Sequence, residues 1–172
     1  MRRLLLICCL LLGISSLSLA QDETQSPYEI ALERILEAEQ SGATELNLKS
    51  LGLTELPPEI GNLTNLLTLD LFANQLTSLP SEIGNLTNLQ RLLLTKNRLV
   101  TLPSEIGNLN KLKTLTLVKN QLINLPPEIG KLVSLRSWVL GENELSTLPP
   151  EIGNLSNLCL LSIRFNQVQY LP

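Results

Sequence analysis

The chain has 172 residues and a formal net charge of −3 at pH 7, and 44% of its residues are hydrophobic. This length predicts one small domain, whose core must be aliphatic because only 3% of the residues are aromatic. The sequence contains no histidine, so metal sites and catalytic triads lose their commonest residue. The acidic balance, without a basic stripe to neutralise phosphates, argues against nucleic acid as a partner.

Residues 1–20 are predicted to form a secretory signal peptide. Two arginines lie at its start, the apolar run from Leu4 to Leu12 is too short to span a membrane, and Ala20 ends a small-residue cleavage motif. Lipid anchoring and an uncleaved anchor are the alternatives. We expect a protein that is secreted or located in the periplasm or cell envelope, with no integral membrane segment after cleavage.

Cleavage after Ala20 would change both the charge and the cysteine content of the chain. It would leave 11 basic and 16 acidic residues, a net charge of −5. It would also remove Cys8 and Cys9, so that Cys159 has no partner for a disulfide within the mature chain. Because Cys159 follows the inward-facing Leu158, we expect a partly buried thiol rather than a reactive or intermolecular cysteine.

Residues 21–42 are predicted to hold a polar leader and then a capping helix over 27–41. Ser26 suits the N-cap, Glu29 would complete a capping box with it, and Gly42 suits the C-terminal end. The apolar residues between them form one broad face. Such a helix would cover the open edge of the repeats that follow, because repeat arrays need capped ends. A partner-binding helix is the alternative.

Residues 43–172 repeat one motif with a period of 23 residues, and its cleanest copy runs from Leu89 to Lys111. A fixed period of this length is typical of a solenoid. Apolar residues alternate with polar ones early in each copy, which predicts a strand. Ile106 and Leu109 are one helical turn apart, and Gly107 offers a permissive backbone where that turn ends. Each unit is therefore predicted to be a strand, a turn, a short helical segment and a turn.

An asparagine recurs in these repeats, in register with inward-facing leucines. We call these residues the asparagine ladder; they are Asn74, Asn97, Asn120, Asn143 and Asn166. A buried amide must find hydrogen-bond partners. We expect each of these side chains to bond the backbone of the bend after the strand, in its own coil and in the next.

The motif L-x-x-L-x-L-x-x-N-x-L resembles that of the leucine-rich repeat family. It is matched by residues 66–76, 89–99, 112–122, 135–145 and 158–168, with Trp138, Ile163 and Val168 in place of leucine. The tail L-P-x-E-I-G-x-L is similar to repeats in bacterial leucine-rich-repeat proteins and in plant intracellular Ras-group-related ones. The resemblance implies an α/β fold, namely a right-handed solenoid with a parallel concave sheet and short helical or 3₁₀ convex turns.

The first and last repeats depart from the pattern. The first, about 43–65, is atypical and has Leu51 where asparagine is expected, and four complete repeats follow it. The sixth is partial and stops at Pro172, without a polar terminal cap. We expect its apolar edge to be partly open, with some of it covered by Phe165 and Tyr170. The open edge could reflect self-association or a shortened chain.

The outward-facing strand positions vary between repeats, whereas the convex turns are nearly identical. We call these positions, together with the residue before each ladder asparagine, the sheet face. The candidate binding residues on it are Asp70, Phe72, Leu93, Lys96, Val118, Lys119, Val139 and Glu142. Aromatic and aliphatic residues exposed together often mark a protein-contact site. The alternative is that strand-forming residues simply fill strand positions.

These patterns favour a protein-protein interaction module over an enzyme. No Gly-rich phosphate loop appears, and we expect no catalytic residue, metal or cofactor. The expected partner is another protein bound on the concave sheet. The alternative function is that of a structural or self-associating unit joined through its uncapped C-terminal edge.

Overall fold

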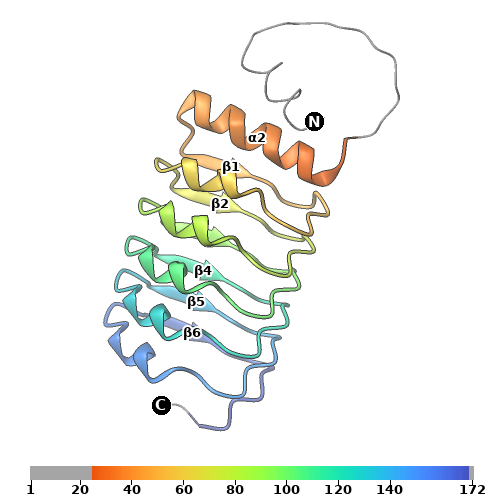
Figure 1. The fold of residues 1–172 in the computed structure, drawn as a ribbon. Coiled ribbons are helices and arrows are strands. Elements are labelled where there is room, and N and C mark those ends of the chain that lie inside the picture. The colour runs from red at the N-terminus through yellow and green to blue at the C-terminus, as the bar shows by residue number, and fades with distance from the viewer. Residues whose placement is uncertain (1–24, 171–172) are drawn as a thin grey trace, which may run out of the picture.

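The computed structural model of the protein describes residues 25–170. The predicted signal peptide and most of the polar leader lie outside the described residues. One α-helix, α2 (Pro27–Ser41), precedes a regular alternation of strands and 3₁₀ helices (Figure 1). The strands are β1 (Glu45–Asn47), β2 (Thr68–Asp70), β3 (Arg91–Leu93), β4 (Thr114–Thr116), β5 (Ser137–Val139) and β6 (Leu160–Ser162). The 3₁₀ helices are η1 (Pro58–Asn62), η2 (Ser81–Asn85), η3 (Ser104–Asn108), η4 (Pro127–Lys131) and η5 (Pro150–Asn154).

The strands form one parallel sheet in the order β1 to β6, with each strand beside its neighbours in sequence. Every strand residue pairs with the residue one period later, as Leu46 pairs with Leu69 and Leu69 with Leu92. The sheet lies along one side of the molecule and the 3₁₀ helices along the other (Figure 1). The predicted solenoid with a parallel sheet and 3₁₀ turns is therefore confirmed.

The core is a continuous column of aliphatic side chains between the sheet and the 3₁₀ helices. In the third repeat, Leu92, Leu94, Leu99, Ile106 and Leu109 are all fully buried, and the same positions are buried in neighbouring repeats. Each such side chain contributes roughly 1.5–3 kcal/mol of transfer free energy. No single coil can bury this set alone, because each inward residue is covered by the coils before and after it.

Helix α2 covers the N-terminal edge of this column over the range predicted from the sequence. Ser26 and Glu29 form the expected capping box, and Gly42 ends the helix in a left-handed conformation with φ of 63°. Ala31 and Ile35 are fully buried within the core cluster. The helix therefore supplies to the first repeat the apolar contacts that a preceding coil would otherwise make. No helix within residues 25–170 is long and apolar enough to cross a membrane.

The glycine of the Glu-Ile-Gly motif has a different role from the one predicted. Gly107 does not have a positive φ; instead, a Cβ built on it would lie 2.6 Å from the carbonyl oxygen of Glu128 in the following repeat. Gly61, Gly84 and Gly130 show the same approach to the next glutamate, at 2.5–2.9 Å. Glycine is needed here because neighbouring 3₁₀ helices stack closer together than any side chain would allow.

Three residues near the C-terminal end also differ from expectation. Cys159 is exposed rather than partly buried. Phe165 and Tyr170 are 79% and 83% exposed, so they do not cover the apolar edge of the last repeat. The reason is that both side chains project from the bend and the following loop, away from the core, where no packing holds them. Trp138, by contrast, is fully buried in an inward leucine position, as predicted.

We predict that Gly107→Ala lowers the free energy of unfolding by about 1–3 kcal/mol, because overpacking against a fixed backbone has effects of this size. Gly153→Ala is the matched control, since Gly153 occupies the same motif position but has nothing within 4 Å of an added Cβ. Urea unfolding followed by the fluorescence of Trp138, the one tryptophan, measures both variants. Equal losses in the two variants would contradict the stacking role of the glycine.

Candidate functional site

The sheet face consists of four columns of side chains with one residue per repeat. The strand register aligns the first two columns, and backbone hydrogen bonds such as Lys96 N–H to Val118 O (2.8 Å) extend this alignment beyond the strands. The first column is Glu45, Thr68, Arg91, Thr114, Ser137 and Leu160, and the second is Asn47, Asp70, Leu93, Thr116, Val139 and Ser162. The third is Lys49, Phe72, Thr95, Val118, Gly141 and Arg164, and the fourth is Ser50, Ala73, Lys96, Lys119, Glu142 and Phe165.

Four of the candidate residues form a zigzag apolar stripe along this face. Phe72, Leu93, Val118 and Val139 lie on successive repeats and alternate between the third and second columns. Neighbouring strands in a sheet are about 4.8 Å apart, so consecutive members lie within reach of one another. All four are half-buried. The stripe is therefore a shallow apolar surface, held in place by the sheet beneath it.

Asp70 is a candidate residue whose side chain also stabilises the backbone after strand β2. Its Oδ1 accepts a hydrogen bond from the Phe72 backbone N–H at 2.9 Å. Asn47 makes the equivalent bond to the Lys49 N–H at 3.1 Å in the first repeat. These bonds fix the backbone where β1 and β2 end, and they hold Phe72 in its column.

The fourth column has a backbone conformation that the sequence analysis did not predict. All six of its residues have φ between 55° and 60°, in the left-handed region, although none is glycine. Such a conformation costs an ordinary residue roughly 1–2 kcal/mol. The only sequence signal is position, because each of these residues comes directly before the ladder asparagine or its counterpart in the first repeat. The left-handed turn bends the chain away from the sheet and leaves these side chains along its edge.

The ladder asparagines satisfy the bends that the fourth column creates. Asn97 Oδ1 accepts from the Leu76 N–H at 3.1 Å, while its Nδ2 donates to Leu71 O at 2.9 Å and Leu94 O at 3.0 Å. Two of these three groups belong to the preceding coil and one to its own. We expected bonds to the following coil, and this direction was wrong. The amide of each asparagine instead contacts the bend of the preceding coil.

This direction explains how the first repeat tolerates Leu51 at the asparagine position. Asn74 of the second repeat accepts from the N–H groups of Leu51 and Leu53 and donates to Leu48 O. Each bend is thus satisfied by the coil that follows it. Asn74, Asn97, Asn120 and Asn143 are only 7–8% exposed, and Asn166 makes the same bonds while partly buried.

We predict that Asn97→Ala lowers the free energy of unfolding by about 2–6 kcal/mol. It leaves the buried Leu76 N–H unpaired, at about 1–3 kcal/mol, and removes one of two amide hydrogen bonds from each of Leu71 O and Leu94 O, at about 0.5–1.5 kcal/mol each. Asn88→Ala is the control, since Asn88 donates to Thr64 O at the exposed surface. The measurement is again urea unfolding. A loss for Asn97→Ala no larger than that for Asn88→Ala would show that the ladder is dispensable.

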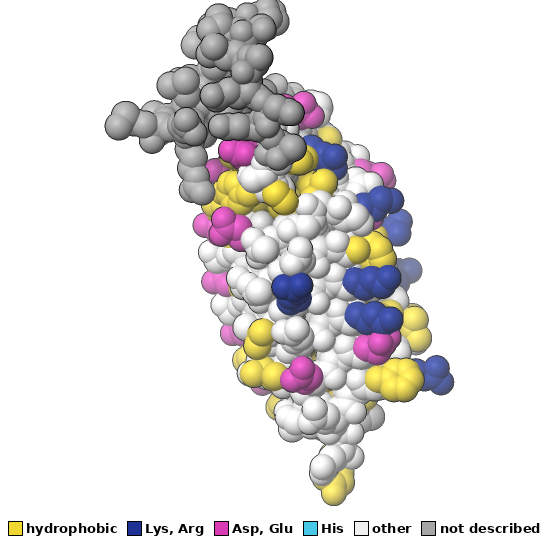
Figure 2. Space-filling model, turned by 90° about the vertical axis from the view of Figure 1, so that its right-hand side faces the viewer, with side chains coloured by type: hydrophobic (Ala, Val, Ile, Leu, Met, Phe, Trp, Pro, Cys, Tyr) yellow, Lys and Arg dark blue, Asp and Glu magenta, His cyan; other side chains and the backbone are white. Residues whose placement is uncertain are grey.

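Two contacts organise the charged residues of the fourth column. Lys96 Nζ lies 5.2 Å from the centre of the Phe72 ring, a cation–π distance. Lys119 Nζ lies 3.6 Å from Glu142 Oε2, and because both side chains are about half exposed this pair adds little to stability. Figure 2 shows Lys and Arg side chains following one another down one edge of the molecule. The edge of the sheet face is therefore charged, whereas its centre is apolar.

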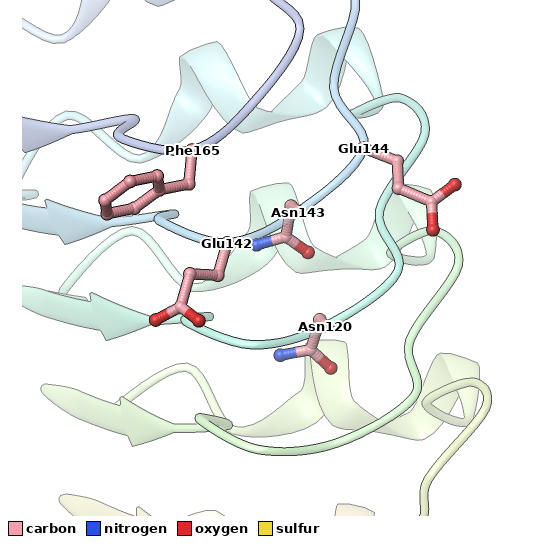
Figure 3. A pocket seen from close by; sticks show the side chains of 5 residues that line it. All are labelled: Asn120, Glu142, Asn143, Glu144 and Phe165. Carbon is pink, nitrogen blue, oxygen red and sulfur yellow. The ribbon is translucent and has the colours of Figure 1, made fainter.

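A shallow depression of about 520 Å³ lies beside the fourth column in the last repeats, lined by Asn120, Glu142, Asn143, Glu144 and Phe165. Glu142 and Phe165 project to the same side from neighbouring bends, while Glu144 projects to the other (Figure 3). The two asparagines at its floor are ladder residues already bonded to backbone groups. Because the acidic side chains do not converge, the depression has no built site for a small molecule. Within residues 25–170, no group of three or more acidic, histidine or cysteine side chains could hold a metal ion.

Comparison with known proteins decides the family. A family model described as "Leucine-rich repeat region" matches residues 45–136, just over half of the chain. The chain belongs to the leucine-rich repeat family. Domains of this family are generally protein-interaction modules, and its members are typically non-enzymatic binding scaffolds.

Solved structures of bacterial and plant proteins are similar to this leucine-rich-repeat chain. The Leptospira interrogans protein LIC12759 is 39% identical, with a TM-score of 0.64, and the match covers 79% of this chain and 41% of that one. YopM from Yersinia enterocolitica is 29% identical, with a TM-score of 0.65 and coverage of 88% and 31%. The plant peptide hormone receptor RGFR1, in complex with RGF2, is 33% identical, with a TM-score of 0.61 and coverage of 65% and 19%.

These similarities confirm the resemblance to bacterial leucine-rich-repeat proteins. The chain spans less than half the length of each of these three proteins. No protein of curated function matches it.

Proposed function

We propose that this chain binds another protein through its sheet face, in a secreted or cell-envelope location. One observation carries the proposal: a half-buried apolar stripe with a charged edge lies on the part of each repeat that varies. The inward positions and the Glu-Ile-Gly turns, by contrast, use nearly the same residues in every repeat. Variation on one face of a repeat scaffold is the pattern expected when that face recognises a partner.

The stacking contacts make this surface rigid before a partner arrives. The ladder asparagines tie each bend to the next coil, and the glycines bring neighbouring 3₁₀ helices into direct contact. A surface whose backbone is already ordered loses little conformational entropy on binding. The mechanism is thus the presentation of a preformed surface, with rotamer changes of the long side chains at its edge.

Two further observations support the proposal. The plant receptor that is similar to this chain forms a complex with RGF2, which is consistent with a binding role for repeats of this type. The extracytoplasmic location rests on the predicted signal at residues 1–20. Catalysis has no support among the candidate residues, where Asp70 bonds a backbone N–H, Lys119 pairs with Glu142 and Lys96 lies over the Phe72 ring.

We predict that the triple variant Phe72→Ala, Leu93→Ala, Val118→Ala weakens partner capture at least about tenfold, because buried aromatic and aliphatic anchors dominate interface energies. The mature domain and the variant would be used as bait in extract from the source organism, with captured proteins identified by mass spectrometry and titrated. Circular dichroism would check that the variant is folded.

A matched control comes from apolar residues off the sheet face. Val100, Ile123 and Val133 are 40–48% exposed, so replacing all three by alanine removes comparable exposed apolar surface elsewhere. This control should capture the same partner with unchanged strength. If it loses the partner while the sheet-face variant keeps it, the proposed site is wrong.

Self-association through the C-terminal edge is a second candidate, favoured by the packing of the last described repeat. Leu160 is 52% exposed, Leu158 and Leu161 are only partly buried, and Gly153 has no neighbour where other glycines meet a glutamate. Strand β6 pairs with β5 alone among the described strands. Edges of this kind readily pair with another chain.

For this second candidate, we predict that the molar mass of the mature protein doubles with rising concentration in light-scattering measurements. A charged substitution at the edge, Leu161→Lys, should return the protein to a monomer, because a buried lysine in the new interface would be unpaired. A constant monomer mass over the whole concentration range would reject this candidate and leave sheet-face binding untouched.

A further inference from the structure

We infer that the segment recognised by the sheet face is acidic: a stretch of extended chain that places carboxylates along the lysine edge and aliphatic side chains on the apolar stripe. This inference rests on the proposed function and adds the chemistry of the partner to it. We give the name lysine edge to the part of the third and fourth columns that runs from the first repeat through the fourth. Its cations are Lys49, Lys96 and Lys119.

Charge is unevenly distributed over the molecule. The four columns of the sheet face carry five basic residues and three acidic ones, a net charge of +2. The rest of the described chain carries six basic and eleven acidic residues, a net charge of −5. The sheet face of this acidic protein is therefore positively charged. Complementary charge steers partners to such a surface and excludes partners of the same sign.

The acidic residues of the sheet face do little to neutralise the lysine edge. The lysine edge contains no carboxylate of its own. Asp70 lies in the second column, and its Oδ1 is engaged by the Phe72 N–H. Glu142 pairs with Lys119 at 3.6 Å, and both partners remain about half exposed. Lys49 and Lys96 make no ion pair shorter than 4.0 Å among the described residues.

The lysines lie beside the apolar stripe. Lys96 Nζ is held 5.2 Å from the Phe72 ring, and Lys49 precedes Phe72 in the same column by one repeat. Phe72 thus has one lysine against its ring and a second lysine one repeat earlier in its own column. An ammonium group over a ring keeps its donors free on the solvent side, where a carboxylate can accept from them.

Spacing favours an extended segment over a single anion. Neighbouring repeats are about 4.8 Å apart at the sheet, so one carboxylate can accept from both Lys96 and Lys119. In an extended chain, side chains that point the same way recur about every 7 Å. A segment with aliphatic residues next to acidic ones would therefore cover Phe72, Leu93 and Val118 while its carboxylates meet the lysine edge. Nucleic acid fits less well, because phosphates would meet the surrounding net negative charge without a continuous basic stripe.

The test selects binders from a displayed library of short random peptides, using the full mature chain as bait. Selected peptides should be enriched in Asp and Glu beside Leu, Ile, Val or Phe, relative to the starting library. One such peptide, made synthetically with a fluorescent label, would then be titrated by anisotropy against the protein and its variants. We expect binding to weaken as salt is raised, because the charges involved are exposed.

Two charge-reversal variants test whether the lysine edge binds the peptide. Lys96→Glu with Lys119→Glu should weaken peptide binding at least about tenfold, through lost attraction and new repulsion. Lys111→Glu with Lys131→Glu is the control, since it changes the net charge equally on turns outside the sheet face, and it should stay within about twofold. Circular dichroism would show that both variants are folded.

The remaining outcomes separate this inference from the function on which it rests. Peptides without acidic enrichment that depend on Phe72, Leu93 and Val118 but not on the lysines would overturn the inference and leave sheet-face binding standing. Peptides that bind every variant equally would overturn both. Selection of no peptide, or displacement of a selected peptide by oligothymidine at low concentration, would also overturn the acidic-segment inference.

Discussion

The structure depends on a buried amide that reaches backward from each coil. Every strand ends in a left-handed bend whose backbone groups face the core, where no water can satisfy them. The asparagine of the following repeat bonds these groups: Asn97, for example, accepts from the Leu76 N–H and donates to Leu71 O and Leu94 O. Because the groups belong to two different coils, these bonds set both the shape of one bend and the spacing to the next.

A second contact, on the opposite side of the coil, complements the first. The glycine of each Glu-Ile-Gly motif lets the following 3₁₀ helix approach to within contact of its backbone. Asparagine on one side and glycine on the other thus hold successive coils in a constant relation, with leucine filling the space between. The side chains of the sheet face take no part in this stacking. They are therefore free to carry an apolar stripe and a lysine edge, and in this way a structural repeat can support recognition.

The parts of this molecule that were predictable from sequence are those that depend on the repeat period or on local capping patterns. The spacing of Asn97 and its equivalents, the alternation around Leu92 and the capping residues Ser26 and Gly42 each follow from local rules. The columns of the candidate site were predictable because residues one period apart occupy equivalent positions. Relations between coils were harder to predict, because they depend on the rise from one repeat to the next. The direction of the asparagine bonds and the close approach at Gly107 both belong to this class.

Local backbone conformation and side-chain direction account for the other differences. Nothing in the chemistry of Ala73, Lys96 or Phe165 signals a left-handed conformation, because it is imposed by the bend and not preferred by the residue. Cys159 and Phe165 are exposed because their positions in the repeat point away from the core, as the exposure of Arg136 and Glu142 one repeat earlier also shows. The binding role of the candidate residues does not follow from the repeat, because the side chains on a surface show its chemistry but do not identify the partner that binds there.

The most direct measurement is methyl NMR of the protein during titration with a captured partner, using leucine, valine and isoleucine labels. The account predicts that the methyl signals of Leu93, Val118 and Val139 shift or broaden on binding. Those of Val100, Ile123 and Val133, which are exposed elsewhere, should stay in place. The reverse pattern, with the sheet-face methyls unmoved by a partner that does bind, would contradict the claim that the sheet face is the recognition surface.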